Sequence, residues 1–169
     1  MKLNVTSLLS FSVIAFSTLF FATSCSKSNN SNPSAGVSAS VNGTNFSATG
    51  AYAGGVYDKG SGSLEIAGFK LAGTDSSAFF ITFDDTVTLN KALDLTAFYS
   101  NADAEVIWTD KSTEFGSDAS GSHGTMTVTG FDKTNKKISG TFSGVFYNYY
   151  STDSVKVTNG TFNTAYVTP

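Results

Sequence analysis

The stretch "GTMTVTGFDKTNKKISGTFSGVF", residues 124–146, contains two predicted strands and the turn that joins them. Apolar residues alternate with threonines before the polar turn, and they return on one face after it. The inward positions are Met126, Val128, Ile138, Phe142 and Phe146. Alternation of apolar and polar residues is typical of a strand with one buried face. The stretch therefore predicts an antiparallel hairpin that packs on a core.

The same pattern continues through the rest of the chain from residue 37. Short alternating runs are "SLEIAGFKL", "SAFFITF", "AEVIW" and "SVKVTNGTF", and the 15 Phe and 7 Tyr against 2 Pro favour strands. The dipeptides Asn42-Gly43 and Asn159-Gly160 are each predicted to form a two-residue type I′ hairpin turn. We expect residues 37–169 to form one all-β domain, an antiparallel β-sandwich or flattened β-barrel of about nine or ten strands.

Two segments depart from this pattern. Residues 89–99, "LNKALDLTAFY", carry both helical and alternating spacings, and we interpret them as a loop followed by a strand. Residues 109–124 have no hydrophobic period and are predicted to be a long exposed loop.

The only cysteine, Cys25, follows a segment of a different kind. Lys2 precedes an apolar run over residues 5–22, and small residues then lead to Cys25, the order of a signal peptide over residues 1–24. The sequence "ATSC" resembles the lipobox of bacterial lipoproteins, although Ala22 stands where Leu is commonest. This resemblance implies that the Cys25 thiol is acylated and anchors the protein in a membrane. An uncleaved membrane anchor and an ordinary secretory signal are the alternatives.

Residues 25–36 are rich in Ser and Asn and are predicted to form a flexible tether behind Cys25. The segments "VNGTNFSA", "GTMTVTGFDKTNKKISGTFSG" and "VTNGTF" resemble a family of Bacteroidota lipoproteins whose function is unassigned. The resemblance implies an all-β protein of the bacterial cell envelope. Ser26 after the cysteine and the lack of an acidic run imply an outer-membrane lipoprotein that faces the periplasm, with the cell surface as the alternative.

Charge and composition exclude several classes of function. The formal net charge is −3 and the chain has no Arg, so no nucleic-acid partner is expected. A single Cys excludes an internal disulfide and cysteine-based metal sites. His123, the only histidine, lies in "SGSHG" and is interpreted as a solvated polar residue. No cofactor is expected.

Carboxylates offer one weak candidate for a metal site. Asp110, Glu114 and Asp118 occur close together and could hold calcium through oxygen ligands, although no calcium-loop consensus is present. Solvated acids of an acidic protein are the alternative interpretation.

The aromatic run "FYNYY", residues 146–150, places Tyr147 and Tyr149 on the outward face if the alternation continues. Exposed tyrosine pairs can bind a glycan or an envelope protein. The alternative is that the two rings cover a sheet edge or pack under the 109–124 segment.

The predicted function is that of a lipid-anchored, non-enzymatic binding or structural module. A carrier of small hydrophobic ligands, suggested by the many Phe, is the second hypothesis, and a carboxylate-based glycosidase is the third.

Overall fold

The structure, a computed structural model, describes residues 35–95 and 104–169. In these residues eleven strands form one sheet, and the only helical segments are two single 3₁₀ turns. The strands are β1 (Gly36–Val41), β2 (Thr44–Thr49), β3 (Ala53–Asp58), β4 (Ser63–Lys70), β5 (Ser77–Asp84), β6 (Ala92–Asp94), β7 (Ala104–Asp110), β8 (Thr113–Gly116), β9 (His123–Asp132), β10 (Lys137–Asn148) and β11 (Ser154–Val167). The predicted all-β class is confirmed, with more strands than the nine or ten expected.

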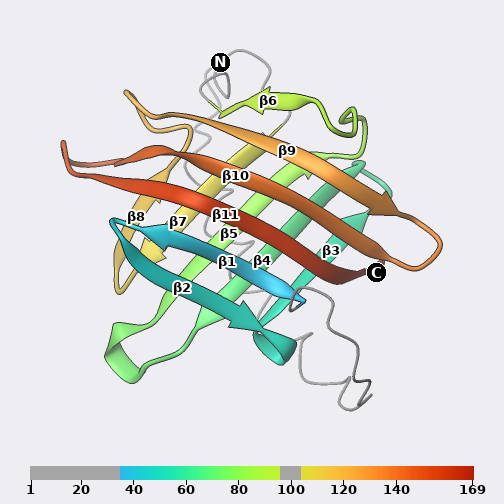
Figure 1. Ribbon diagram of the computed structural model, residues 1–169, viewed down its shortest axis with the longest axis horizontal. Coiled ribbons are helices and arrows are strands. Elements are labelled where there is room, and N and C mark those ends of the chain that lie inside the picture. The colour runs from blue at the N-terminus through green and yellow to red at the C-terminus, as the bar shows by residue number, and fades with distance from the viewer. Residues whose placement is uncertain (1–34, 96–103) are drawn as a thin grey trace, which may run out of the picture. The chain divides into compact units, whose positions relative to one another are not determined.

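The strand order is β2-β1-β11-β3-β4-β5-β7-β8-β10-β9-β6, and β10 also pairs with β11, so that the sheet closes partly into a ring. All pairs are antiparallel except β11 with β3. In Figure 1, β1, β11, β10 and β9 cross in front of β3, β4, β5 and β7. Two short joints connect these layers: β11 meets β3 at Tyr166 and Val167, and β10 meets β8 at Tyr147 and Asn148.

The predicted hairpin over residues 124–146 is confirmed as β9 and β10. Its turn is held by Asp132, whose Oδ1 accepts the backbone N–H groups of Thr134 and Asn135 at 2.9 and 2.8 Å. Asp side chains favour turns because they bond to nearby backbone in this way. The inward face of β10 is buried as expected.

The core consists of aromatic rings that touch across the layers. Phe79 of β5 lies 5.1 Å from Phe46, 4.6 Å from Trp108 and 5.2 Å from Phe142, measured between ring centroids. Most of these rings meet edge to face, the arrangement that aromatic quadrupoles prefer. The phenylalanines predicted to face inward therefore fill the space between the layers.

The far end of β11 is closed by a second aromatic cluster. Tyr57, Phe131 and Tyr166 lie within 5.7–5.9 Å of one another, and the Lys133 ammonium lies over the Phe131 ring at 5.0 Å. Asp85 accepts hydrogen bonds from the Tyr57 hydroxyl at 2.5 Å and from Lys133 at 3.1 Å. These contacts reinforce the two-residue joint between β11 and β3.

The two Asn-Gly dipeptides have different structures. Asn42 and Gly43, with φ of 49° and 82°, form the predicted two-residue turn between β1 and β2. The prediction for Asn159-Gly160 was wrong, because both residues lie inside the continuous strand β11. There β11 has one residue more than β1 and β10, which is a β-bulge with Asn159 at φ 53°.

The bulge keeps the inward face of β11 apolar. Before it, Val155 and Val157 are buried, and after it the buried positions change parity, with Phe162 and Tyr166 inward. Gly160 is needed for close packing and not for a turn, because a Cβ there would lie 2.4 Å from the carbonyl oxygen of Phe142.

The prediction of a long exposed loop at residues 109–124 was also wrong. This segment contains the end of β7 and the whole of β8, and Phe115, Ser117 and Ser122 are buried. The Ser122 hydroxyl donates to the Gly116 carbonyl at 2.7 Å and accepts the Tyr147 N–H at 2.8 Å. The segment is therefore tied to β10.

Three predictions extend beyond the described residues. The signal peptide and Cys25 lie outside them, and β1 already begins at Gly36, the last residue of the predicted tether. Of residues 89–99, the described part is a loop and the short strand β6, as predicted. No helix within the described ranges is long and apolar enough to cross a membrane.

Candidate ligand-binding cleft

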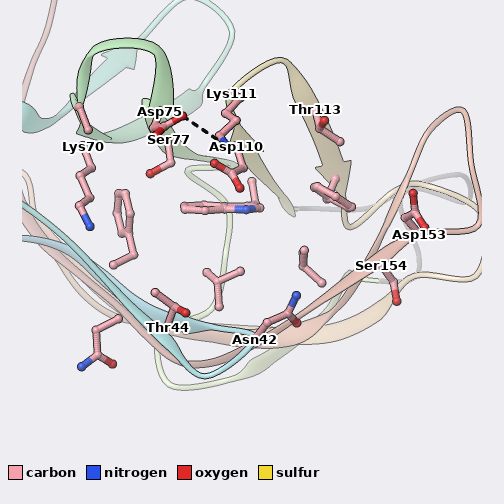
Figure 2. A pocket seen from close by; sticks show the side chains of 17 residues that line it. Asn42, Thr44, Lys70, Asp75, Ser77, Asp110, Lys111, Thr113, Asp153 and Ser154 are labelled. Carbon is pink, nitrogen blue, oxygen red and sulfur yellow. Dashed lines mark ion pairs between the residues drawn. The ribbon is translucent and has the colours of Figure 1, made fainter.

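A cleft of about 830 Å³ opens between the layers at the end opposite the Tyr57 cluster. One wall is formed by the β1–β2 turn and the start of β11, and the other by the β4–β5 connection and the β7–β8 turn. Figure 2 shows Asn42 and Thr44 on one side, facing Asp75, Ser77 and Asp110 on the other. The volume is in the range of small-molecule binding pockets, roughly 300–1,000 Å³.

The floor of the cleft is aromatic. Phe46, Trp108 and Phe115 line it, and each is largely buried. The indole of Trp108 packs on Phe46 at 5.2 Å, so its position is fixed by the core. The floor therefore offers apolar aromatic surface whose position is fixed.

The indole N–H of Trp108 has no hydrogen-bond partner within the part of the chain that the structure describes. Every fully buried side-chain nitrogen or oxygen of the described residues has a hydrogen-bond partner. Because the indole nitrogen of Trp108 has none among them, it is not fully buried, although the residue as a whole is only 6% exposed. Solvent reaches it through the cleft that Trp108 lines. A tryptophan this deeply buried usually has a partner for its N–H.

The rim carries charges of both signs. Two lysines, Lys70 and Lys111, and three aspartates, Asp75, Asp110 and Asp153, line the cleft, so the lining has one net negative charge. Lys111 and Asp75 form an ion pair at 3.3 Å, and both side chains are more than half exposed. Such a pair contributes at most about 1 kcal/mol to stability.

Turn geometry fixes the polar groups of the rim. The Asn42 Oδ1 accepts the Lys156 N–H at 2.8 Å, which leaves its amide nitrogen pointing into the cleft (Figure 2). Lys111, with φ of 57°, occupies the β7–β8 turn, and its N–H donates to the Ser76 carbonyl at 2.9 Å. Hydrogen bonds to neighbouring backbone groups therefore hold both walls in place.

A separate cluster of carboxyl groups lies at the joint between β7, β8 and β10. Ser117 exchanges two hydrogen bonds with the Val106 backbone, at 2.9 and 3.0 Å, and this places Asp118 beside Glu105. The Tyr149 hydroxyl donates to Asp118 at 2.5 Å. The segment after β8 is therefore held to both β7 and β10.

Burial raises the pKa of Glu105 to about 8, with further contributions from the Asp118 charge, a hydrogen bond with Asp118 and the charges of Glu114 and Glu65. Glu105 is therefore protonated at neutral pH and can donate to Asp118. The same surroundings raise the pKa of Tyr149, mainly through burial and its bond to Asp118. Glycosidases instead separate their two carboxyl groups by roughly 5–10 Å.

The predicted calcium ligands do not converge. Asp110 lines the cleft, Glu114 lies on β8, and Asp118 bonds to Tyr149. Within the described residues, no three His, Cys, Asp or Glu side chains are grouped to hold a metal ion. His123 begins β9, is exposed, and lies 3.2 Å from the Gly121 carbonyl oxygen.

The predicted surface of Tyr147 and Tyr149 is half buried. The Tyr149 hydroxyl covers Gly116, where any side chain would collide with it, and the Tyr147 ring lies against Gly121. This is the packing under the 109–124 segment that we gave as the alternative. Tyr150 is 93% exposed, and its ring centroid lies 6.4 Å from that of Tyr149.

Sequence reasoning missed the cleft itself. Its walls come from turns that are more than a hundred residues apart, such as Asn42 and Asp153. The alternation in "AEVIW" puts Val106 and Trp108 on one face of a strand, but nothing in the sequence indicates that the Trp108 N–H would be left open.

Comparisons with known proteins give no relative on which to base a function. No protein-family model matches the chain, and no curated protein or solved structure matches it significantly.

Proposed function

We propose that this protein is a lipid-anchored, non-enzymatic binding module of the bacterial cell envelope and that the cleft holds its ligand. The observation that carries the proposal is the cleft floor, where the N–H of the 6% exposed Trp108 opens to solvent and has no partner among the described residues. An unpaired donor on a rigid aromatic base is a preformed contact for a ligand.

The envelope location is supported by the amino-terminal sequence. Cys25 follows the signal-like segment 1–24, and the Ser- and Asn-rich residues after it would let the domain stand away from the membrane. Acyl chains on Cys25 would provide the anchor, since more than one chain gives stable attachment. The resemblance to Bacteroidota lipoproteins suggests the outer membrane, with the domain facing the periplasm and the cell surface as the alternative.

Packing favours binding in the cleft over the other two hypotheses. The phenylalanines that suggested a hydrophobic-ligand carrier contact one another in the core of what is best described as a flattened barrel, as Phe79 does with Phe46 and Phe142. The two carboxyl groups nearest to this arrangement, Glu105 and Asp118, interact closely enough that Asp118 helps to raise the pKa of Glu105. Such an interaction suits a shared proton better than a glycosidase, whose two carboxyl groups lie roughly 5–10 Å apart.

Tryptophan fluorescence tests the proposal, because Trp108 is the only tryptophan in the chain. The full chain, purified in detergent, would be titrated with pooled neutral oligosaccharides, acidic oligosaccharides, tripeptides and a fatty acid. A saturable change in emission with a pool of polar compounds is expected. A response to the fatty acid alone would favour the hydrophobic-ligand carrier, and cleavage of a bound oligosaccharide would favour the glycosidase. No response to any pool would contradict a ligand site at the cleft.

A further inference from the structure

We infer that the ligand of the cleft is a neutral carbohydrate chain, an inference that rests on the proposed function of the cleft. Four polar groups of the lining have hydrogen-bonding capacity that no described residue uses: the Trp108 N–H, the Asn42 amide nitrogen, the Lys70 ammonium and the Asp110 carboxylate. They lie on both walls, and they include donors and an acceptor (Figure 2).

Hydroxyl groups match this mixture because each one both donates and accepts. A sugar oxygen can accept from the indole N–H of Trp108 and from the Asn42 amide, while a sugar hydroxyl donates to Asp110. The apolar C–H faces of the same ring can contact the edges of Phe46 and Phe115 on the floor. A polyhydroxylated ring thus satisfies the polar rim and the apolar floor together.

Charge argues against an anionic polymer. The lining has three Asp against two Lys, and Lys111 is already paired with Asp75. Only Lys70 is left to attract an anion, while Asp110 and Asp153 repel it. An acidic glycan should therefore bind more weakly than a neutral glycan of equal length.

A peptide is the main competitor, since an extended chain could pair with the free edge of β2. Only the first residues of β2, Thr44 to Phe46, line the cleft, so the edge available there is short. The four unused groups belong to side chains and not to the backbone, whereas β-strand addition depends on backbone hydrogen bonds.

Isothermal titration calorimetry on the full chain in detergent tests this assignment. The probes are neutral hexasaccharides (maltohexaose, cellohexaose, xylohexaose and mannohexaose), the acidic hexagalacturonate, and hexa-alanine. At least one neutral hexasaccharide should bind saturably, and Asp110→Asn should weaken it by about tenfold, the loss expected for a hydrogen bond to a charged group. Asp84→Asn, an exposed carboxyl at the end of β5, is the matched control and should leave binding unchanged.

Trp108→Phe removes the indole N–H while keeping an aromatic ring, and it should abolish measurable binding; a melting curve of the variant checks that the fold persists. If the variant does not fold, Asp110→Asn and its control decide. Binding of hexagalacturonate or hexa-alanine without any neutral hexasaccharide would overturn the carbohydrate assignment and leave the cleft as a binding site. Failure of every probe would overturn both.

Discussion

Replacing Glu105 with Gln should remove most of the pH dependence of this protein's stability between about pH 5 and 8. Burial, followed by the charge of Asp118 and a hydrogen bond with it, raises the pKa of Glu105 from 4.5 to about 8. Glutamine keeps the shape and a donor of the protonated carboxyl but cannot ionise. The variant therefore resembles the form of Glu105 that the folded protein prefers.

The sign follows from the protons bound in each state. Between pH 4.5 and about 8 the folded protein keeps the Glu105 proton that the unfolded chain has lost. The free energy of unfolding must then fall as pH rises, by at most about 1.4 kcal/mol per pH unit. The stabilisation is fully present below pH 4.5 and is lost as pH rises to about 8. From about pH 5.5 to 7.5 the loss is roughly 2.5 kcal/mol, or roughly 10 °C in Tm for a domain of this size.

Thermal melts followed by circular dichroism measure the effect at both pH values. The parent should melt at a lower temperature at the higher pH, and Glu105→Gln should lose most of that difference and be the more stable protein at the higher pH. Asp84→Asn controls for the removal of one negative charge. Equal drops in Tm for the parent and for Glu105→Gln would show that ionisation of Glu105 does not cause the pH dependence.

Three further substitutions test other parts of the structure. Gly160→Val should lower stability by about 1–3 kcal/mol, because its side chain would collide with Phe142, and an unchanged denaturant midpoint would refute the bulge packing. Tyr149→Phe should cost about 1–2 kcal/mol by removing the donor to Asp118, whereas an unaltered melt would show that this bond adds nothing. Cys25→Ala should release the protein from the membrane fraction or leave an uncleaved precursor, and unchanged fractionation with unchanged intact mass would end the lipoprotein hypothesis.

Local patterns in the sequence predicted which side chains face the core. The inward residues of β5, β7, β9 and β10 follow from the period of two, and the Asn42-Gly43 turn follows from its dipeptide. The same dipeptide at Asn159-Gly160 gave the wrong answer. A hairpin turn and a β-bulge both change which alternate residues face inward between Val157 and Phe162. Only the pairing of β11 with β1 and β10 shows that a bulge is present.

The cleft and the carboxyl cluster depend on contacts between distant parts of the chain. Asn42 is oriented by the Lys156 backbone, and the Trp108 N–H is left open because the layers part at that end. Glu105 and Asp118 meet because Ser117 bonds to the backbone of the β7 strand. No spacing in the sequence indicates these contacts. Composition could therefore suggest candidate residues, but it could not show which of them lie together.

The most direct test of the account follows the indole N–H of Trp108 by NMR. Labelling with ¹⁵N-tryptophan gives a spectrum with one indole signal, because the chain has one tryptophan. Adding the neutral hexasaccharide that binds in calorimetry should shift this signal downfield and slow its exchange with solvent, as the N–H exchanges solvent for a sugar oxygen as its acceptor. An indole signal that stays in place while calorimetry shows saturation would place the ligand elsewhere and contradict a binding site at Trp108.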